Sequence, residues 1–436
     1  MEKFSVRAVP DARCAEIRGR RQLSGCVLQY LNSLVAVREG YDIKKFLAPA
    51  LIFFGVALLT AAIAVPLWLV PKLKVVPLDL DITSVSTSVP AGLTDDNNTP
   101  ARVFNRCSIN EPRAEVLDAH LTQQRRSIII NPSDSDQATL QSGQTVMIDL
   151  LRDGDKTTEP TAEPVNAKRT CKDAVLTSNV DVVSVDRKTS KPNGNIARIH
   201  TLEAPEGTVT IDGTDNFVEA PRKGYQYKFG FDVKKTDQLY YDANTRQDVP
   251  AKFVEEEKID GVTAYHFVSD VPEVDQVTLP TPNGQPALGT SLEKPASWWG
   301  IKGVPANEPV VMDRFAKATR HVWVEPETGT ILKGLEEQHQ YFKSPGWEDP
   351  DLAAPLREFR MDAFAATMEW NSTTVEHQSD KASGYVDQLR IGGVIVPAIL
   401  GVVGGLLLIG GVILLLRRRP GGDASNDDTV QFAKTP

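Results

Sequence analysis

The chain has 436 residues, 41% of them hydrophobic, and a formal net charge of −9 at pH 7. An acidic chain of this kind is poorly suited to bind nucleic acid or to cover an anionic surface, so no nucleic-acid partner is expected. The four cysteines include no C-x-x-C pair, which argues against a zinc site or a thioredoxin-type redox centre.

Residues 1–45 mix charges without a hydrophobic period, and we expect a poorly ordered cytoplasmic tail there. Residues 46–70 hold no charged side chain, and about 20 apolar residues suffice for a helix to cross a bilayer. Ala62 and Ala64 also fit the A-x-A pattern of a signal-peptide cleavage site, but the apolar run continues beyond them. The sequence therefore predicts an uncleaved transmembrane helix.

Residues 71–390 are expected to form a mainly β (α+β) domain outside the cytoplasm. Asp260-Gly261 between two alternating runs predicts a hairpin, and further turns are predicted at 192–194 and 327–329. Pro-rich stretches at 156–165 and 277–307 are expected to be surface loops. Two helical stretches complete the prediction for this domain, at 353–361 and at 379–389.

The segment 224–233 alternates aromatic and polar residues, which is typical of a half-buried strand. Its aromatic side chains are Tyr225, Tyr227, Phe229 and Phe231. A curved sheet either fills its interior or leaves a ligand cavity. These four residues are therefore candidates to line an apolar cavity, with core packing as the alternative for each of them.

Trp298 and Trp299 are adjacent in the stretch PASWWGIKG. Paired indoles beside Gly and Pro either pack on a core or contact a lipid surface. We treat both as candidates for the entry of a ligand, with core packing as the alternative.

Residues 391–416 form a second uncharged run, and 417–436 a short polar tail that is expected to be cytoplasmic and disordered. Lys44 and Lys45 precede the first run, and three Arg begin the tail that follows the second. Short flanks rich in Lys and Arg stay in the cytoplasm. Both termini are thus predicted to be inside the plasma membrane, with 71–390 outside.

Small residues recur in both predicted spans and suggest that the two helices pack on each other. The predicted contact rows are Ala50, Ala57, Ala61 and Ala64 on the first span, and Gly393, Pro397, Gly401 and Gly405 on the second.

Cys107 and Cys171 are the two cysteines of the predicted outer domain, where disulfides persist, while Cys14 and Cys26 belong to the cytoplasmic tail. We therefore expect a disulfide between Cys107 and Cys171.

No catalytic, cofactor or metal site is predicted. Ser291 and Lys294 match S-x-x-K, but Pro residues around them argue against the helical turn that this catalytic pair needs. The six histidines show no paired metal-ligand spacing. Acidic stretches at 95–98 and 212–216 are explained by turn chemistry.

Several motifs occur in a recognisable order: PLDLDITSVST from Pro77, then YKFGFDVKKTDQLYYD, GVTAYHF and VWVEPETGTILKG, and a last span closed by three Arg. Over residues 46–420 this order resembles the actinobacterial PorA-type porin family. The resemblance implies a two-span membrane protein with a large outer domain and a cell-wall channel function, and it implies no catalytic residues.

Neither predicted span carries a polar stripe that would line a water-filled pore. The layout is instead similar to that of class B scavenger receptors, whose outer domain carries lipid. We therefore expect a cell-envelope protein that binds or transfers an apolar or lipid ligand. The alternatives are a porin or channel-associated protein, and an envelope scaffold or sensor. Membrane lipid is the expected partner, with cell-wall components as a further possibility.

Overall fold

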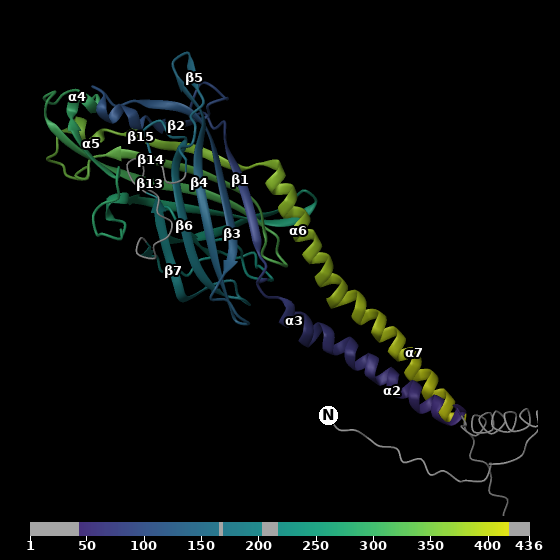
Figure 1. The fold of residues 1–436 in the computed structure, drawn as a ribbon. Helices are drawn as coiled ribbons and strands as arrows, with labels where there is room; N and C mark the ends of the chain where they lie inside the picture. Colours follow the sequence, from purple (N-terminus) through teal and green to yellow (C-terminus); the bar gives the residue numbers. More distant parts are fainter. Residues whose placement is uncertain (1–42, 165–168, 203–216, 418–436) are drawn as a thin grey trace, which may run out of the picture. The chain divides into compact units, whose positions relative to one another are not determined.

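The computed structural model describes residues 43–164, 169–202 and 217–417 (Figure 1). They divide into two compact units: a helical unit, and a β unit that spans Trp68–Gly393. The predicted tails and Cys14 and Cys26 lie outside the described residues, apart from 43–45 and Arg417. A mainly antiparallel β domain with a long helix at each end confirms the predicted fold class.

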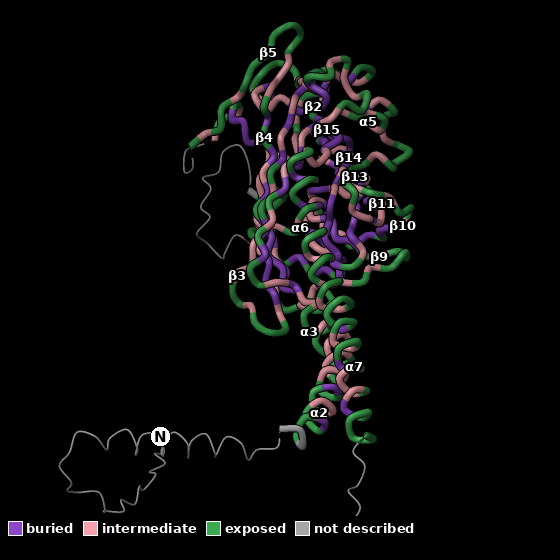
Figure 2. The backbone as a smooth tube through the Cα atoms, turned by 90° about the vertical axis from the view of Figure 1, so that its right-hand side faces the viewer, coloured by how far each residue is buried: buried purple, intermediate pink, exposed green. Residues whose placement is uncertain are grey.

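The helical unit contains α2 (Ile43–Ala64) and α7 (Val396–Leu416). Two helical stretches, Phe46–Leu73 and Ser372–Leu416, are long and apolar enough to cross a membrane, and most of each apolar stretch is exposed (Figure 2). Short π-helical turns, η1 (Val65–Leu69) and η5 (Ile391–Ile395), lie where the chain passes from one unit to the other.

Backbones of α2 and α7 approach closely. A Cβ atom added at Gly55 would lie 2.8 Å from the Gly404 carbonyl oxygen, and one at Gly411 would lie 2.7 Å from a side-chain carbon of Ile52. The prediction that the spans pack on each other is therefore confirmed. Small residues allow this close approach, and dispersion contacts then hold the pair together.

The contact row predicted on α2 was wrong, since Ala50, Ala57 and Ala64 are exposed, and the row predicted on α7 was right only in part. The buried residues of α7 are Pro397, Gly404 and Gly411, seven residues apart, whereas no described atom lies within 4 Å of a Cβ added at Gly405. A row with a four-residue period turns by about 40° around the helix at each step, so it leaves the interface, whereas a seven-residue period stays on it. Of the row predicted on α7, Pro397 is buried and Gly401 faces the partner helix, opposite Ala62.

The β unit contains a 15-stranded sheet whose described strand pairs are antiparallel. Along its main path the strand order is β8-β7-β6-β4-β3-β1-β15-β14-β13-β11-β10-β9, and β2, β5 and β12 pair at the side of it. The strands are β1 (Asp81–Val89), β2 (Ala101–Phe104), β3 (Val116–Ile130), β4 (Gln137–Asp153), β5 (Lys156–Thr158), β6 (Val175–Asp186), β7 (Pro192–Leu202), β8 (Val218–Glu219), β9 (Gln238–Asp242), β10 (Gln247–Ile259), β11 (Val262–Asp275), β12 (Ser291–Pro295), β13 (Pro309–Val324), β14 (Ile331–Lys343) and β15 (Met361–Trp370).

The other helices of the β unit are α3 (Val70–Leu73), η2 (Arg106–Asn110), η4 (Gln276–Thr278), α4 (Ala296–Trp299), α5 (Ala354–Glu358) and α6 (Ser372–Arg390). The helices predicted at 353–361 and 379–389 correspond to α5 and to the second half of α6. Asn371 caps α6 by accepting a hydrogen bond from the Thr374 amide, which satisfies one of the free donors of the first turn.

Hairpins were predicted well. Asp260 and Gly261 both have positive φ, 46° and 82°, as a two-residue turn between β10 and β11 requires. The turn at 327–329 joins β13 to β14 as predicted. The turn predicted at 192–194 lies at 187–191 instead, because the Asp186 carboxylate accepts hydrogen bonds from the Lys188 and Thr189 amides and folds the chain earlier.

The strand predicted at 224–233 is not formed. Its backbone groups find partners other than a strand ladder: the Asp248 carboxylate accepts from the Gly224 amide, and the Gly329 carbonyl accepts from the Phe229 amide. A single bridge between Tyr225 and Tyr240 is its β contact. The four aromatic side chains therefore do not share one face, since an irregular backbone imposes no two-residue period.

The segment 277–307, which was predicted to be a loop, contains β12 and α4. These elements form because apolar side chains of the segment pack into a hydrophobic core. Trp298 and Trp299 are each 4% exposed and pack with Phe104 and Phe342. Ser291 and Lys294 lie three residues apart on β12, so they point to opposite faces of a strand, and the Lys294 ammonium donates to the Ile109 carbonyl.

Candidate functional site

An apolar cavity of about 270 Å³ lies within the β unit. Its walls come from α3 and the chain that follows it, from β1, from α6, from residues 227–231 and from the turn before β14. The apolar side chains in these walls are Val70, Leu73, Val75, Pro77, Leu80, Ile82, Tyr227, Phe231, Ile331, Trp370 and Leu389. The volume is slightly below the range of about 300–1,000 Å³ that is typical of small-molecule sites.

Helix α6 forms one wall of this cavity. Its buried residues include Thr374, Gln378 and Ala382, four residues apart on one face, and this face packs against the sheet (Figure 1). The face is held in place where the Thr374 hydroxyl accepts a hydrogen bond from the Val85 amide of β1. Gln378 and Lys381 reach the cavity from this helix.

Gln378 is the most buried polar residue that lines the cavity. It is 1% exposed, and its Nε2 has no hydrogen-bond partner among the described residues. Buried polar groups are almost always paired, because water is no longer available to them. Gln378 Nε2 is one of several buried side-chain atoms without a partner among the described residues, and it belongs to a residue that lines a largely apolar wall.

Lys228 and Tyr385 also line the cavity. The Lys228 ammonium donates to the Phe229 and Thr328 carbonyls, and burial lowers the pKa of Lys228 to about 7, against a smaller opposing effect of Glu325. Burial raises the pKa of Tyr385. Half-buried Lys381 donates to the Asp81 carbonyl with a distance of 3.2 Å.

The predicted lining residues divide into two pairs. Tyr227 and Phe231 lie at the wall of the apolar cavity. Tyr225 and Phe229 stack on each other, with ring centroids 4.8 Å apart, in a core cluster that also contains Phe267. The alternative interpretation, core packing, thus describes the second pair.

Trp298 and Trp299 do not line this cavity. They lie in the core at the end of the sheet that carries α4 and α5, whereas α3 lies at the other end of the β unit (Figure 1). Their indole N–H groups donate to the Ser108 and Val310 carbonyls. The structure gives neither residue a place at the mouth of the apolar cavity.

The predicted disulfide is confirmed: Cys107 and Cys171 are bonded. The bond joins η2 to the segment before β6, across 64 residues of sequence. Arg106 supports the same junction by donating to the Asp173 and Val175 carbonyls.

The sheet curls so that strands far apart in its order face a common, partly polar interior. One interior cavity of about 60 Å³ is lined from β1, β3, β13 and β14, and another of about 200 Å³ from β4, β6, β7 and β14. Arg320 donates to Asp242 at 3.0 Å and to Glu336 at 2.6 Å. Burial alone would lower the pKa of Arg320, but these two carboxylates raise it.

Arg314 lines the larger interior cavity. Its Nε has no hydrogen-bond partner among the described residues, and burial lowers its pKa to about 10. Arg222 forms a bidentate ion pair with Asp181, in which both hydrogen bonds are 2.7 Å long. Charged groups of the interior are thus mostly held in pairs.

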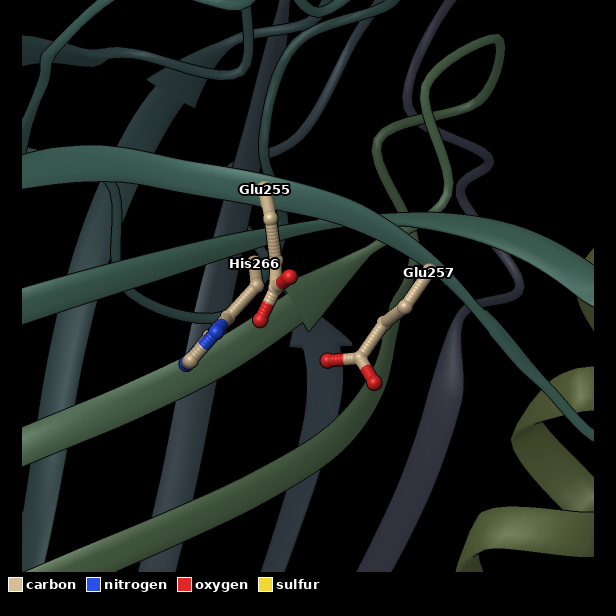
Figure 3. Close-up of side chains that lie close together, drawn as sticks. All are labelled: Glu255, Glu257 and His266. Carbon is tan, nitrogen blue, oxygen red and sulfur yellow. The ribbon is translucent and has the colours of Figure 1, made fainter.

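A group of side chains with metal-ligand chemistry lies on β10 and β11: Glu255, Glu257 and His266, whose ligand atoms are within 4.8 Å of one another (Figure 3). His266 is hydrogen-bonded to His321 at 3.0 Å. Burial, followed by the His321 charge, lowers the pKa of His266. Glu257 accepts from the Trp323 indole, which gives one of the two carboxylates a structural role.

Sequence analysis missed Gln378 and Lys228. The signal for Gln378 was available, because Thr374, Gln378 and Ala382 repeat with helical spacing in a segment with few large apolar residues. Lys228 is one of the polar residues that alternate with aromatic ones in the strand predicted at 224–233, which does not form. No pattern in the sequence marks it as a cavity residue.

Fold and cavities together define a class: an apolar helix at each end of one curled antiparallel sheet that encloses polar space and carries an apolar cavity beside α6. The family model of Porin PorA matches residues 47–413. The chain therefore belongs to the porin PorA family, as the resemblance in its motifs indicated.

Two relatives carry the name Porin PorA. One, from Corynebacterium amycolatum, is 29% identical over 397 residues and covers 83% of this chain and 96% of the relative. The other, from Corynebacterium resistens, is 27% identical over 416 residues, with 83% of this chain and 94% of the relative covered. The similarity extends over nearly the whole of both relatives.

Proposed function

We propose that this protein acts in the cell envelope as a porin or as a channel-associated protein, and not as an enzyme. The family match over 47–413 carries this proposal, because it includes both apolar helices and the β unit. The interior of the sheet supports it: arginine, glutamine and carboxylate groups face cavities there, as polar side chains do in the lumen of a porin.

Any water path of this protein depends on the β unit and on further chains. The sequences 46–70 and 391–416 contain no charged side chain, and Thr60 is the one hydroxyl group among them. Two such helices from one chain do not line a polar pore. A conducting assembly therefore needs several copies or a partner protein at the membrane.

Conductance of the purified full-length protein in planar lipid bilayers tests this function. We expect discrete conductance steps whose anion preference decreases in Arg314→Gln, because Arg314 is a cation at an interior cavity. Arg126→Gln is the matched control, since Arg126 lies on the exposed side of β3 and pairs with Asp81. Protein that never conducts, alone or after co-purification with bound proteins, would contradict the proposal.

A second function is favoured by the apolar cavity: the β unit binds or transfers an apolar or lipid ligand. A cavity of about 270 Å³ with predominantly apolar walls is suited to part of a lipid molecule. Membrane lipid is the proposed partner, with cell-wall components as further contacts. Mass spectrometry of protein purified in mild detergent should find bound lipid. If it finds none and conductance is absent too, an envelope scaffold or sensor is the remaining proposal.

We place the protein in the plasma membrane with both termini in the cytoplasm. Lys44 and Lys45 flank the first span and Arg417, Arg418 and Arg419 the second, which supports this orientation. The β unit is then outside the cytoplasm, where the Cys107–Cys171 disulfide is stable.

A further inference from the structure

We propose that the apolar cavity beside α6 binds one acyl chain of a membrane lipid and that Gln378 Nε2 donates a hydrogen bond to the carbonyl group of that chain. The inference rests on the second proposed function, lipid binding, and adds the site, the chemical group that is recognised and the residue that recognises it.

Gln378 is 1% exposed, lines the cavity and leaves Nε2 without a partner among the described residues. A buried donor without an acceptor is costly, and an acceptor supplied by a ligand removes that cost. A carboxyl, ester or amide carbonyl is such an acceptor, whereas a plain hydrocarbon is not.

The walls of the cavity are largely apolar. Leu80 and Ile82 line the cavity from the start of β1, and Phe231, Ile331 and Trp370 from other segments of the β unit. Polar side chains such as Gln378 and Lys381 also line the cavity, but apolar residues form most of its walls. An alkyl chain fits these walls, because it needs no hydrogen bonds.

The position of the cavity indicates the source of the ligand. Val70, Leu73, Leu389 and Gly392 line the cavity, and all four belong to the two apolar helical stretches that are long enough to cross a membrane. The cavity is therefore built in part from the residues that continue these stretches into the β unit. Membrane lipid is the acyl compound that such residues meet.

Lys228 and Lys381 add cationic groups to the lining. Lys228 already donates to two carbonyls, and Lys381 donates to the Asp81 carbonyl. Their positive charge favours a free carboxylate over a neutral ester at the same place. Comparison of a fatty acid with its ester therefore distinguishes a free fatty acid from the acyl chain of a larger lipid.

The experiment uses three photoreactive probes of equal chain length: palmitic acid, methyl palmitate and hexadecane, each with a diazirine in the chain. Full-length protein in detergent is labelled over a range of probe concentrations, and the labelled peptides are identified by mass spectrometry. We expect label on α6 and on 227–231, with the two carbonyl probes effective at about tenfold lower concentration than hexadecane, as one hydrogen bond allows. Palmitic acid labelling better than its ester assigns a free fatty acid, and equal labelling assigns the acyl chain of a larger lipid.

Gln378→Leu should remove the preference for the carbonyl probes and keep the labelling by hexadecane, with Gln378→Met as a second variant if the first does not fold. Ser379→Ala is the matched control, because Ser379 is the next residue, is equally buried and does not line the cavity. Ile82→Trp should reduce labelling by all three probes, since it fills the cavity.

Three outcomes would overturn the inference. Unchanged carbonyl preference in Gln378→Leu would show that another group recognises the carbonyl. Lipid that co-purifies while no probe labels α6 would place the lipid elsewhere and leave the second proposed function intact. Absence of both co-purified lipid and labelling would refute lipid binding itself.

Discussion

The pKa of Lys228 is determined mainly by the burial of its side chain. Its ammonium group lies between the Phe229 and Thr328 carbonyls, and burial lowers its pKa from 10.5 to about 7. Carbonyl dipoles and the nearby Glu325 offset only part of the cost of removing a cation from water. The protonation state of this residue therefore changes near neutral pH.

The lowered pKa predicts how stability depends on pH. Between pH of about 7 and 10 the unfolded chain binds more protons at this position than the folded protein does. The contribution of Lys228 therefore rises with pH in this window, by at most about 1.4 kcal/mol per unit, and is constant below it. Urea unfolding of the wild type and of Lys228→Met at several pH values measures this difference. Lys302→Met, at an exposed position, serves as the control. A difference between Lys228→Met and the wild type that does not change with pH would refute the assignment.

The sequence could not reveal Lys228 as a cavity residue. Lys228 alternates with aromatic neighbours, as it would in a strand. The strand does not form, because the amides of this segment donate hydrogen bonds to the Asp248 carboxylate and to the Gly329 carbonyl. Contacts such as these join residues far apart in sequence, so a local period does not contain them. Cys107 and Cys171 were predictable because the choice of partners was limited to two.

At the scale of elements, the helix pair depends on three levels of small residues. Ala48, Gly55 and Ala62 on α2 lie opposite Gly411, Gly404 and Gly401 on α7, in antiparallel order. Because lipid is as apolar as the side chains, close backbone contact rather than hydrophobic burial holds such a pair. Side-chain volume at these positions should therefore control the association.

A disulfide between the two helices can measure this association. In protein without Cys14 and Cys26, Ala62→Cys with Gly401→Cys should cross-link readily, because Cβ atoms at these positions are 3.9 Å apart. Adding Gly404→Leu should reduce the yield, since overpacking costs about 1–3 kcal/mol. Adding Gly405→Leu should leave it unchanged, as no described atom lies within 4 Å of that position. Equal yields in both variants would contradict the heptad contact.

Elements with strong local signals were predicted correctly, and those set by distant contacts were not. Asp260-Gly261 specifies its own turn through positive φ, so the hairpin of β10 and β11 could be read directly. The presence of packing between α2 and α7 followed from composition. Its exact face did not, because the spans contain small residues at both a four-residue and a seven-residue spacing, and only contact with the partner helix selects between them.

At the scale of the whole molecule, the orientation in the membrane is the property from which the others follow. We predict that Cys14 and Cys26 are shielded from a membrane-impermeant maleimide in intact cells and react after permeabilisation. Asp237→Cys should react in intact cells, because Asp237 is exposed on the β unit. The outer cysteines do not interfere, since they are bonded to each other. Labelling of Cys14 in unbroken cells would reverse the proposed topology.

The position of β1 has a consequence for how the protein is made. This strand is the first of the sheet, yet its neighbours are β3 and β15, so that Ser86 is paired with both Gln123 and Trp370. During synthesis the centre of the sheet thus stays open until almost the entire β unit has been made. Contacts between residues so distant in sequence form slowly. Until they form, the unpaired central strand can pair with strands of other chains. With the proposed topology, the nascent protein should therefore depend on chaperones outside the cytoplasm for longer than its final stability would suggest.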